Sequence, residues 1–180
     1  MALTRLNNRS VSAVTALPSG IDIPAGAIVR ADLPVGTIIQ TVAFRSQIGV
    51  SMTTTTLADT GYGATITPTN SSNKIKVTFA CSELRSRGDV GANIDLYRNG
   101  TNIVAIFKEI GYSGGAGGTQ TTGSIGMGAA WSYVDSPAST SALTYQVYAR
   151  KLTSNAGNVE FLPNSTNSGA ITIILEEIVA

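Results

Sequence analysis

The sequence contains no histidine. This absence excludes Ser-His-Asp and Cys-His nucleophile pairs, zinc sites with histidine ligands and imidazole acid–base catalysis. The single cysteine, Cys81, cannot form a disulfide within the chain. It alternates with the apolar residues Ile75, Val77 and Phe79, which predicts a small buried core residue. We therefore expect no catalytic residues and no cofactor.

Charged residues are also scarce. They make up 13% of the chain, against roughly 25% in an ordinary globular domain. Lys and Arg number 12 and Asp and Glu 11, a net charge of +1, and no basic run forms a patch, so we expect no nucleic-acid partner. No segment approaches the roughly 18 apolar residues of a membrane span, and no apolar signal core follows the first residues. We expect no membrane partner either.

The length of 180 residues suits one domain with its own hydrophobic core. Residues 1–34 contain three of the six prolines, Pro18, Pro24 and Pro34, and show no sustained period of 2 or 3.6. Because proline fixes φ and removes a hydrogen-bond donor, we predict an extended N-terminal arm there, used for attachment or subunit contact. Residues 35–180 are predicted to form a β-sandwich domain.

From Gly36 onward, the chain consists of short segments rich in Ile, Val, Thr, Tyr and Phe, mostly separated by Gly, Asn, Ser or Pro. No window predicts a capped amphipathic helix longer than about two turns. The predicted strands are residues 37–44, 62–67, 74–82, 94–98, 101–110, 127–134, 143–150, 159–162 and 170–178. This pattern predicts an all-β fold, a jelly-roll-like antiparallel β-sandwich with an extended N-terminal arm.

Two local signals support this fold class. In the segment 143–150, apolar Leu143, Tyr145, Val147 and Ala149 alternate with polar residues and Tyr148, the period of a half-buried strand. Between two other strands stands Asn99-Gly100. That dipeptide predicts a two-residue type I′ hairpin, because both positions tolerate positive φ.

Residues 111–128 are rich in glycine, which predicts a long flexible loop between two strands. No Gly-Lys-Ser/Thr follows it, so a phosphate cradle is not expected. Contact with a partner surface and a tolerated surface insertion both remain open for this loop. The candidate partner-contact residues lie in the loop and in the arm: Tyr112, Gly115, Gly117, Arg5, Asn8, Arg9, Pro18, Pro24 and Pro34.

Oxygen-bearing side chains provide the remaining candidates for chemistry. Asp89, Asn93 and Asp95 stand at positions of the same parity, so their side chains point the same way, as in calcium loops, but the glycine and distal glutamate are not at the required spacing. A polar strand face is predicted instead, and cation binding by these three stays open. Two carboxylates across a cleft could hydrolyse a glycosidic bond, yet nothing in the sequence pairs any two. The carboxylate candidates are Asp59, Glu83, Asp89, Asp95, Glu109, Asp135 and Glu160.

The order of several turn and strand segments resembles a family of small bacteriophage virion proteins, labelled tail-fibre or head-decoration proteins. The resemblance covers most of residues 36–180. It rests on Gly36–Thr41, Thr53–Thr56, Asp59–Gly61, Ala64–Pro68, Ser71–Ile75, Asp135–Pro137, Ser141–Tyr145 and Ile171–Ile178.

This resemblance implies a sandwich domain that assembles as a trimer and supplies no catalytic residues. We expect a non-enzymatic structural protein located in the virion, with two partners: itself, as a homotrimer, and the major capsid protein. The expected role is a capsid decoration (cement) protein that stabilises the shell. A tail-fibre module that contacts tail proteins and a host surface receptor is the alternative, and a carbohydrate-degrading depolymerase is a second one.

Overall fold

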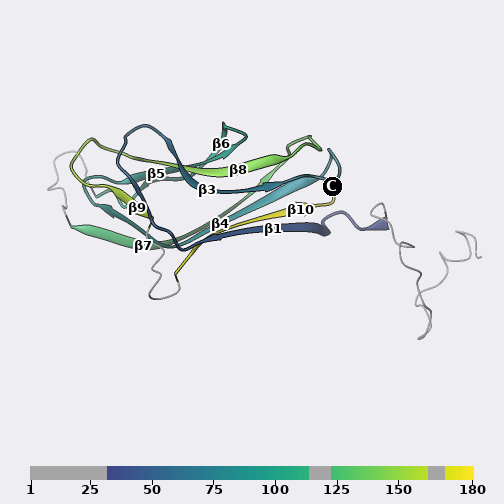
Figure 1. Ribbon diagram of the computed structural model, residues 1–180, viewed down its shortest axis with the longest axis horizontal. Helices are drawn as coiled ribbons and strands as arrows, with labels where there is room; N and C mark the ends of the chain where they lie inside the picture. Colours follow the sequence, from purple (N-terminus) through teal and green to yellow (C-terminus); the bar gives the residue numbers. More distant parts are fainter. Residues whose placement is uncertain (1–31, 114–122, 162–168) are drawn as a thin grey trace, which may run out of the picture. The chain divides into compact units, whose positions relative to one another are not determined.

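The computed structural model describes residues 32–113, 123–161 and 169–180, which contain ten β-strands (Figure 1). The chain divides into two units, Met1–Leu33 and Pro34–Ala180, and all of these strands belong to the second. The strands are β1 (Ile38–Ser46), β2 (Val50–Met52), β3 (Ala58–Ile66), β4 (Lys74–Arg87), β5 (Ala92–Arg98), β6 (Thr101–Ile110), β7 (Ser124–Asp135), β8 (Leu143–Lys151), β9 (Val159–Phe161) and β10 (Ile171–Ile178). The described residues contain no helix with the length and hydropathy of a membrane span.

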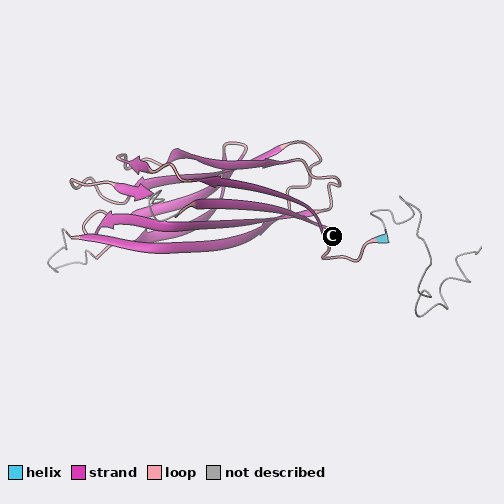
Figure 2. Ribbon diagram, turned by 60° about the horizontal axis from the view of Figure 1, so that its bottom comes forward, coloured by secondary structure: helices cyan, strands magenta, loops and turns pink. Residues whose placement is uncertain are grey.

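The strands form two antiparallel sheets that lie face to face (Figures 1 and 2). The larger sheet has the order β1-β10-β4-β9-β2, with β7 paired to β4 as well. The smaller sheet has the order β3-β8-β5-β6. The fold is therefore an all-β sandwich, and the predicted fold class is confirmed.

The pairing of the strands defines a jelly roll. With the short strands β2 and β9 set aside, the first of the eight long strands pairs with the last, β1 with β10. The second then pairs with the seventh, the third with the sixth and the fourth with the fifth: β3 with β8, β4 with β7, and β5 with β6. This nested order is that of a long hairpin wrapped into two sheets, the arrangement of a jelly roll.

Strand β8 has the faces that its sequence predicts. Leu143, Tyr145, Val147 and Ala149 are buried, whereas the residues between them are partly exposed. The same alternation holds in β10 and along most of β4, so the core lies between the two sheets. A continuous apolar layer of this kind supplies the main driving force for folding.

The turn between β5 and β6 also matches its prediction. Asn99 has φ 48° and Gly100 has φ 79°, and a type I′ turn requires positive φ at both positions. The Asn99 side chain further accepts a hydrogen bond from the Thr144 backbone N–H at 2.8 Å, which ties the turn to β8. Asn99 therefore acts both in the turn and between strands.

The strand predictions were wrong at several boundaries. β2 was not predicted, because a strand of three residues owes its existence to pairing with β9 and carries no periodic pattern of its own. β3 begins at Ala58 and β4 extends to Arg87, beyond the predicted ends. The glycine-rich loop is shorter than predicted, since Ser124–Gly128 belong to β7 and pair with β4. The residues 114–122 of this loop lie outside the described residues.

A buried carboxylate joins the two sheets near one end. Asp135, the last residue of β7, accepts hydrogen bonds on Oδ2 from Arg98 Nη1 at 2.5 Å and from the Tyr145 hydroxyl at 2.7 Å. Arg98 and Tyr145 belong to the opposite sheet. Burial raises the pKa of Tyr145 above its ordinary value, and the hydrogen bond to Asp135 raises it further. The tyrosine therefore stays protonated and donates this bond.

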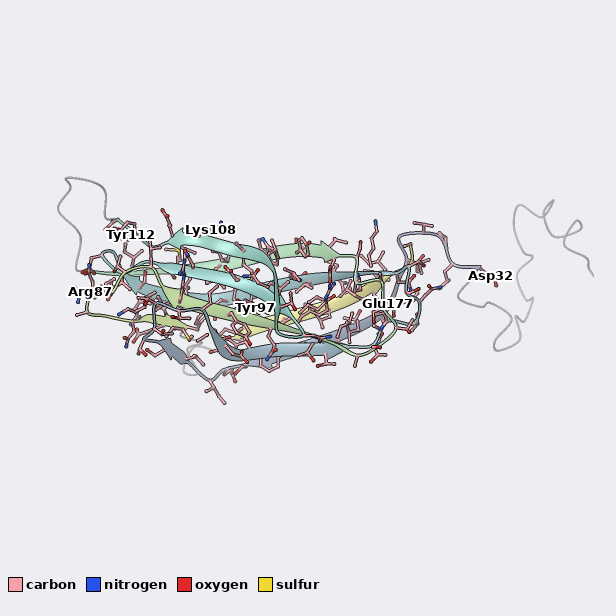
Figure 3. The ribbon with its side chains drawn as sticks, turned by 90° about the horizontal axis from the view of Figure 1, so that it is seen from above. Asp32, Arg87, Tyr97, Lys108, Tyr112 and Glu177 are labelled. Atoms are coloured by element: carbon pink, nitrogen blue, oxygen red, sulfur yellow. The ribbon has the colours of Figure 1, made fainter. Side chains whose placement is uncertain are left out.

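A second buried carboxylate ties a loop to the larger sheet. The Glu177 side chain of β10 is fully buried, and Figure 3 shows it towards one end of the sandwich, with Arg87 and Tyr112 towards the other. Its Oε1 accepts hydrogen bonds from the Thr69 backbone N–H (2.6 Å), the Thr69 hydroxyl (2.7 Å) and the Asn73 amide (2.7 Å). These donors all come from the connection between β3 and β4. Glu177 thus fixes the path of that connection.

Removing the cation of the buried pair should destabilise the fold. In Arg98→Met, the Asp135 carboxylate keeps Tyr145 but loses its charged partner, so we expect the free energy of unfolding to fall by about 2–4 kcal/mol. Lys76→Met is the matched control, because its pair with Glu176 is more exposed, 39% and 18% against 28% and 9%. That variant should lose less than about 1 kcal/mol. Equal losses in urea denaturation would contradict the role given to Asp135.

Cys81 should be unreactive in the folded protein. Its side chain is 3% exposed, and burial raises the pKa of the thiol to about 11. Because the thiolate is the nucleophile, alkylation by iodoacetamide at neutral pH should be at least roughly a hundredfold slower in the native protein than in urea. Mass spectrometry over a time course measures both rates on the chain's one thiol. Equal rates would show that Cys81 is not a core residue.

Candidate functional site

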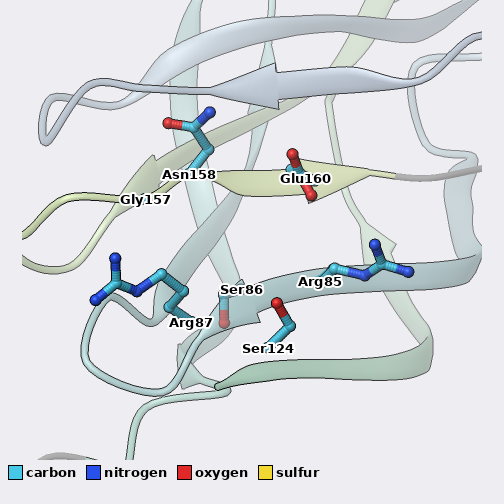
Figure 4. A pocket seen from close by; sticks show the side chains of 7 residues that line it. All are labelled: Arg85, Ser86, Arg87, Ser124, Gly157, Asn158 and Glu160. Carbon is cyan, nitrogen blue, oxygen red and sulfur yellow. The ribbon is translucent and has the colours of Figure 1, made fainter. Parts of the chain in front are cut away.

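A polar pocket lies beside β4, β7 and β9 (Figure 4). It has a volume of about 220 Å³. Its lining consists of Arg85, Ser86 and Arg87 from β4, Ser124 from β7, and Gly157, Asn158 and Glu160 from β9 and the residues before it. The strand pairing creates this grouping, because Arg85 is opposite Glu160 in β9 and opposite Gly126 in β7.

Arg87 lines the pocket, and its guanidinium group is fixed by an ion pair with Asp89. Arg87 donates from Nε and Nη2 to the two carboxylate oxygens of Asp89, at 3.0 and 2.9 Å. Asp89 is in turn held through its carbonyl oxygen, which accepts hydrogen bonds from the Thr153 hydroxyl at 2.7 Å and the Asn155 amide at 3.0 Å. Gly157 has φ +119°, and a Cβ there would lie 2.6 Å from Arg87 Cδ. Glycine therefore lets the backbone pass directly against the arginine.

A second arginine, Arg85, comes from the same strand, and Figure 4 shows the two guanidinium groups pointing away from one another, with Ser124 between them. Arg85 donates from Nε and Nη2 to Glu83 Oε1, at 3.1 and 2.6 Å. Both arginines thus donate from Nε and Nη2 to a carboxylate two residues away in the chain. Glu160, which faces the pocket from β9, makes no ion pair within the described part of the chain. The pocket can therefore offer hydrogen-bond donors and an acceptor to a ligand.

The three oxygen-bearing residues considered for a cation take separate partners. Asp89 pairs with Arg87, Asn93 accepts a hydrogen bond from the Glu109 backbone N–H, and Asp95 accepts one from Asn102. Within the described ranges, no group of three or more Asp, Glu or Cys residues could hold a metal ion. The structure does not bring these three side chains together.

The other carboxylate candidates are likewise spread over the molecule. Asp59 accepts a hydrogen bond from Gln146 on the smaller sheet, and Asp135 is buried between the sheets. Glu83 pairs with Arg85 beside the pocket that Glu160 lines. Of these carboxylates only Glu160 belongs to the pocket lining, and Glu83 is occupied by the Arg85 guanidinium group.

Most of the candidate partner-contact residues lie outside the described residues: Arg5, Asn8, Arg9, Pro18, Pro24, Gly115 and Gly117. Two can be placed. Pro34 is exposed, and its carbonyl accepts hydrogen bonds from the Thr37 hydroxyl and backbone N–H. Tyr112 is half-buried against Gly91, and the close approach requires glycine, because a Cβ at Gly91 would lie 2.8 Å from Tyr112 Cβ. Tyr112 therefore packs within its own chain rather than standing free.

An apolar edge is the second surface feature. β6 and β7 are edge strands of different sheets, opposite the side where β1 lies against β3. Large side chains along both strands are only partly buried against the core. We define the apolar edge as Ile103, Val104, Phe107 and Ile110 of β6 with Met127, Trp131 and Tyr133 of β7.

Two aromatic residues of this edge, Trp131 and Tyr133, lie on β7. The Trp131 and Tyr133 rings are stacked, with centroids 5.7 Å apart and planes 7° apart. Both point to the core side of the sheet, as their shared parity predicts, but they are only partly covered. The other strand, β6, pairs with β5 through three register shifts, and such bulges hinder the addition of a further strand. A partner would therefore contact side chains here.

Sequence reasoning missed the pocket. The alternation of Glu83, Arg85 and Arg87 does indicate that three charged side chains share one face of a strand. Nothing in the sequence indicates that β9, only three residues long, pairs with β4 at that point. The apolar edge was missed for a similar reason, since period-2 patterning marks a core face but not whether a strand lies at the edge of its sheet.

No known protein family matches the sequence, and no curated protein does. Among solved structures, a chain of the infectious bursal disease virus VP2 subviral particle is similar, with a TM-score of 0.40 and 11% identity over 80% of this chain and 38% of that one. A chain of the T13 IBDV viral particle has a TM-score of 0.39 and 12% identity over 80% and 37%. Latent dimeric PorU from Porphyromonas gingivalis has a TM-score of 0.32 and 8% identity over 81% and 14%. The chain spans well under half the length of each.

Proposed function

We propose that this protein is a non-enzymatic structural component of a bacteriophage virion. In this proposal it is a capsid decoration (cement) protein that forms a homotrimer and stabilises the shell by binding the major capsid protein. The resemblance of residues 36–180 to small phage virion proteins supplies the virion setting. No family or curated-protein match tests that resemblance.

The observation that carries the proposal is the apolar edge. Partly exposed Phe107 of β6 and Trp131 and Tyr133 of β7 lie on the two edge strands opposite the side where β1 and β3 are in contact. Aromatic side chains are enriched in the centres of protein interfaces, where they bury a large area for little lost conformational freedom. A second copy of the chain placed against this edge would bury these side chains and protect two edge strands.

The outer face of the larger sheet supports an assembly role as well. Its side chains are small and mostly uncharged in the central rows, which run Ala43, Ile174, Thr78 and Ser132 and, beside them, Arg45, Thr172, Ala80 and Ala130. A face with few ions packs against another surface with little desolvation cost. We assign the subunit contact to the apolar edge, and the contact with the capsid to the N-terminal arm.

One observation favours the alternative role as a tail-fibre receptor-binding module. The pocket at β4, β7 and β9 is lined by polar side chains, among them Ser124, Asn158 and Glu160. Such side chains could form hydrogen bonds with a host-surface ligand.

The location of the protein on the particle tests the proposed function. In a cryo-electron microscopy reconstruction of the whole phage, we expect the sandwich as three-fold density on the outside of the capsid. Density for this protein only at the tail would overturn the decoration role and leave the receptor-binding alternative.

The mass in solution tests the subunit contact. The 18.5 kDa chain should sediment as a trimer, and Ile103→Lys should dissociate it, because a charge buried in an apolar contact is costly. Ile48→Lys is the matched control, since Ile48 is 76% exposed and does not belong to the apolar edge. A stable wild-type monomer, or a trimer that tolerates Ile103→Lys while keeping its fold by circular dichroism, would contradict this contact.

A further inference from the structure

The end of the larger sheet where β1 begins exposes apolar side chains. Within the described ranges, the exposed large apolar side chains are Val35, Ile38, Ile48 and Val134. Val35 lies just before β1, Ile38 is the first residue of β1, and Val134 is the penultimate residue of β7, which ends at the same end of the sheet. Three of the four thus gather at one end, and apolar side chains grouped in this way indicate a contact surface more than single scattered ones do.

The N-terminal arm joins the sandwich at this same end. The Gly36 backbone N–H donates to the Val179 carbonyl at 2.8 Å, and the Val179 N–H donates to the Thr37 carbonyl at 2.9 Å. The start of the second unit is therefore fixed next to the end of β10, and Figure 1 shows β1 beginning where the chain ends. Because Met1–Leu33 is continuous with Pro34, any partner that the arm binds is tethered to this end of the sheet.

The outer face that begins at this end is four strands wide and has few unpaired charges. β1, β10, β4 and β7 lie side by side in it. The two rows nearest the arm consist of Ile38, Ile178 and Lys74, followed by Thr41, Glu176, Lys76 and Val134. Lys76 and Glu176 neutralise each other at 2.9 Å, and the two central rows add one charged residue, Arg45, at the margin on β1. Covering such a face costs little ion desolvation.

The outer face of the smaller sheet differs in this respect. Its middle row consists of Asp59, Tyr148 and Asp95. Asp59 accepts a hydrogen bond from Gln146 at 2.9 Å and Asp95 accepts one from Asn102 at 2.6 Å, and neither carboxylate is buried. A partner that covered this row would remove the remaining hydration of two anions, which is costly. The larger sheet is therefore the one whose outer face suits a protein contact.

The area of this outer face limits its role. Four strands about 4.8 Å apart and four rows about 6.8 Å apart give roughly 500 Å². A specific protein interface needs about 800 Å² from each partner. Two copies of the chain that met only through these faces would therefore fall short of a stable contact. A partner that also binds the arm would reach the required area.

From these observations we infer that the outer face of the larger sheet lies against the capsid shell, and that this face and the N-terminal arm contact the same partner, the major capsid protein. The inference rests on the proposed decoration role and adds the orientation of the sandwich, with the larger sheet towards the shell and the smaller sheet towards the solvent. It requires a capsid surface with few charges and with apolar side chains opposite Ile38 and Val134.

The test is co-sedimentation of the full chain with capsids from the same phage grown without this protein. We expect the wild-type chain to bind them. Ala43 is exposed in a central row of the outer face. Ala43→Arg should lower the affinity at least roughly tenfold, because the contact would bury an unpaired charge.

The matched control is Thr65→Arg. Thr65 is likewise exposed, but it lies on β3 opposite Thr144, on the outer face of the smaller sheet. This variant should bind capsids as the wild-type chain does. Neither residue belongs to the apolar edge, so both variants should keep the wild-type mass in sedimentation and the wild-type circular dichroism spectrum.

Three results would overturn the inference, and they separate it from the proposed function. Unchanged affinity in Ala43→Arg, or an equal loss in Thr65→Arg, would reject this orientation and leave the decoration role in place. A lower mass of Ala43→Arg in the absence of capsids would assign the face to contact between copies of the chain instead. A wild-type chain that does not bind the capsids at all would reject the decoration role together with the inference.

Discussion

The Asp135 carboxylate sets the relation between the two sheets at one end of the sandwich. Apolar burial drives the layers together but has no direction, whereas the bonds from Arg98 and Tyr145 to one oxygen of Asp135 require a defined placement of β7 over β5 and β8. Because Asp135 ends β7, it also fixes where the preceding residues of that strand lie. The pairing of β7 with β4 then places Trp131 opposite Phe79 and Tyr133 opposite Val77.

Many of the few charged side chains of this protein interact with other groups of the same chain. Asp89, Glu83, Asp135 and Glu176 each pair with a cation, and Glu177 is surrounded by neutral donors. The central rows of the outer face of the larger sheet and the apolar edge carry mostly uncharged side chains, which pack against a partner at low desolvation cost. Glu160 differs from these carboxylates, because it lines a recess and forms no ion pair in the described ranges. The surface thus offers one region suited to packing and another suited to hydrogen bonding.

Local patterns predicted the elements that their own residues stabilise. β8 alternates as its sequence does, and Asn99-Gly100 forms the turn that this dipeptide favours. Elements that depend on a distant partner were missed or misplaced. β2 was missed because it exists through pairing with β9, and Ser124–Gly128 became strand because β4 extends far enough to pair with them, despite glycines that favour a loop. Register between strands far apart in sequence has no local signal, so these errors have a common cause.

The sequence by itself determined the all-β class, the core face of the regular strands and the burial of Cys81, since period-2 alternation of apolar residues specifies a half-buried strand. The missing histidine likewise limited the chemistry available to the chain. Only the tertiary structure decided which strands became edges, which carboxylates were buried, and that Arg85, Ser124 and Glu160 line one pocket. Those properties follow from the nested pairing of the jelly roll, which brings together residues that lie dozens of positions apart in the chain.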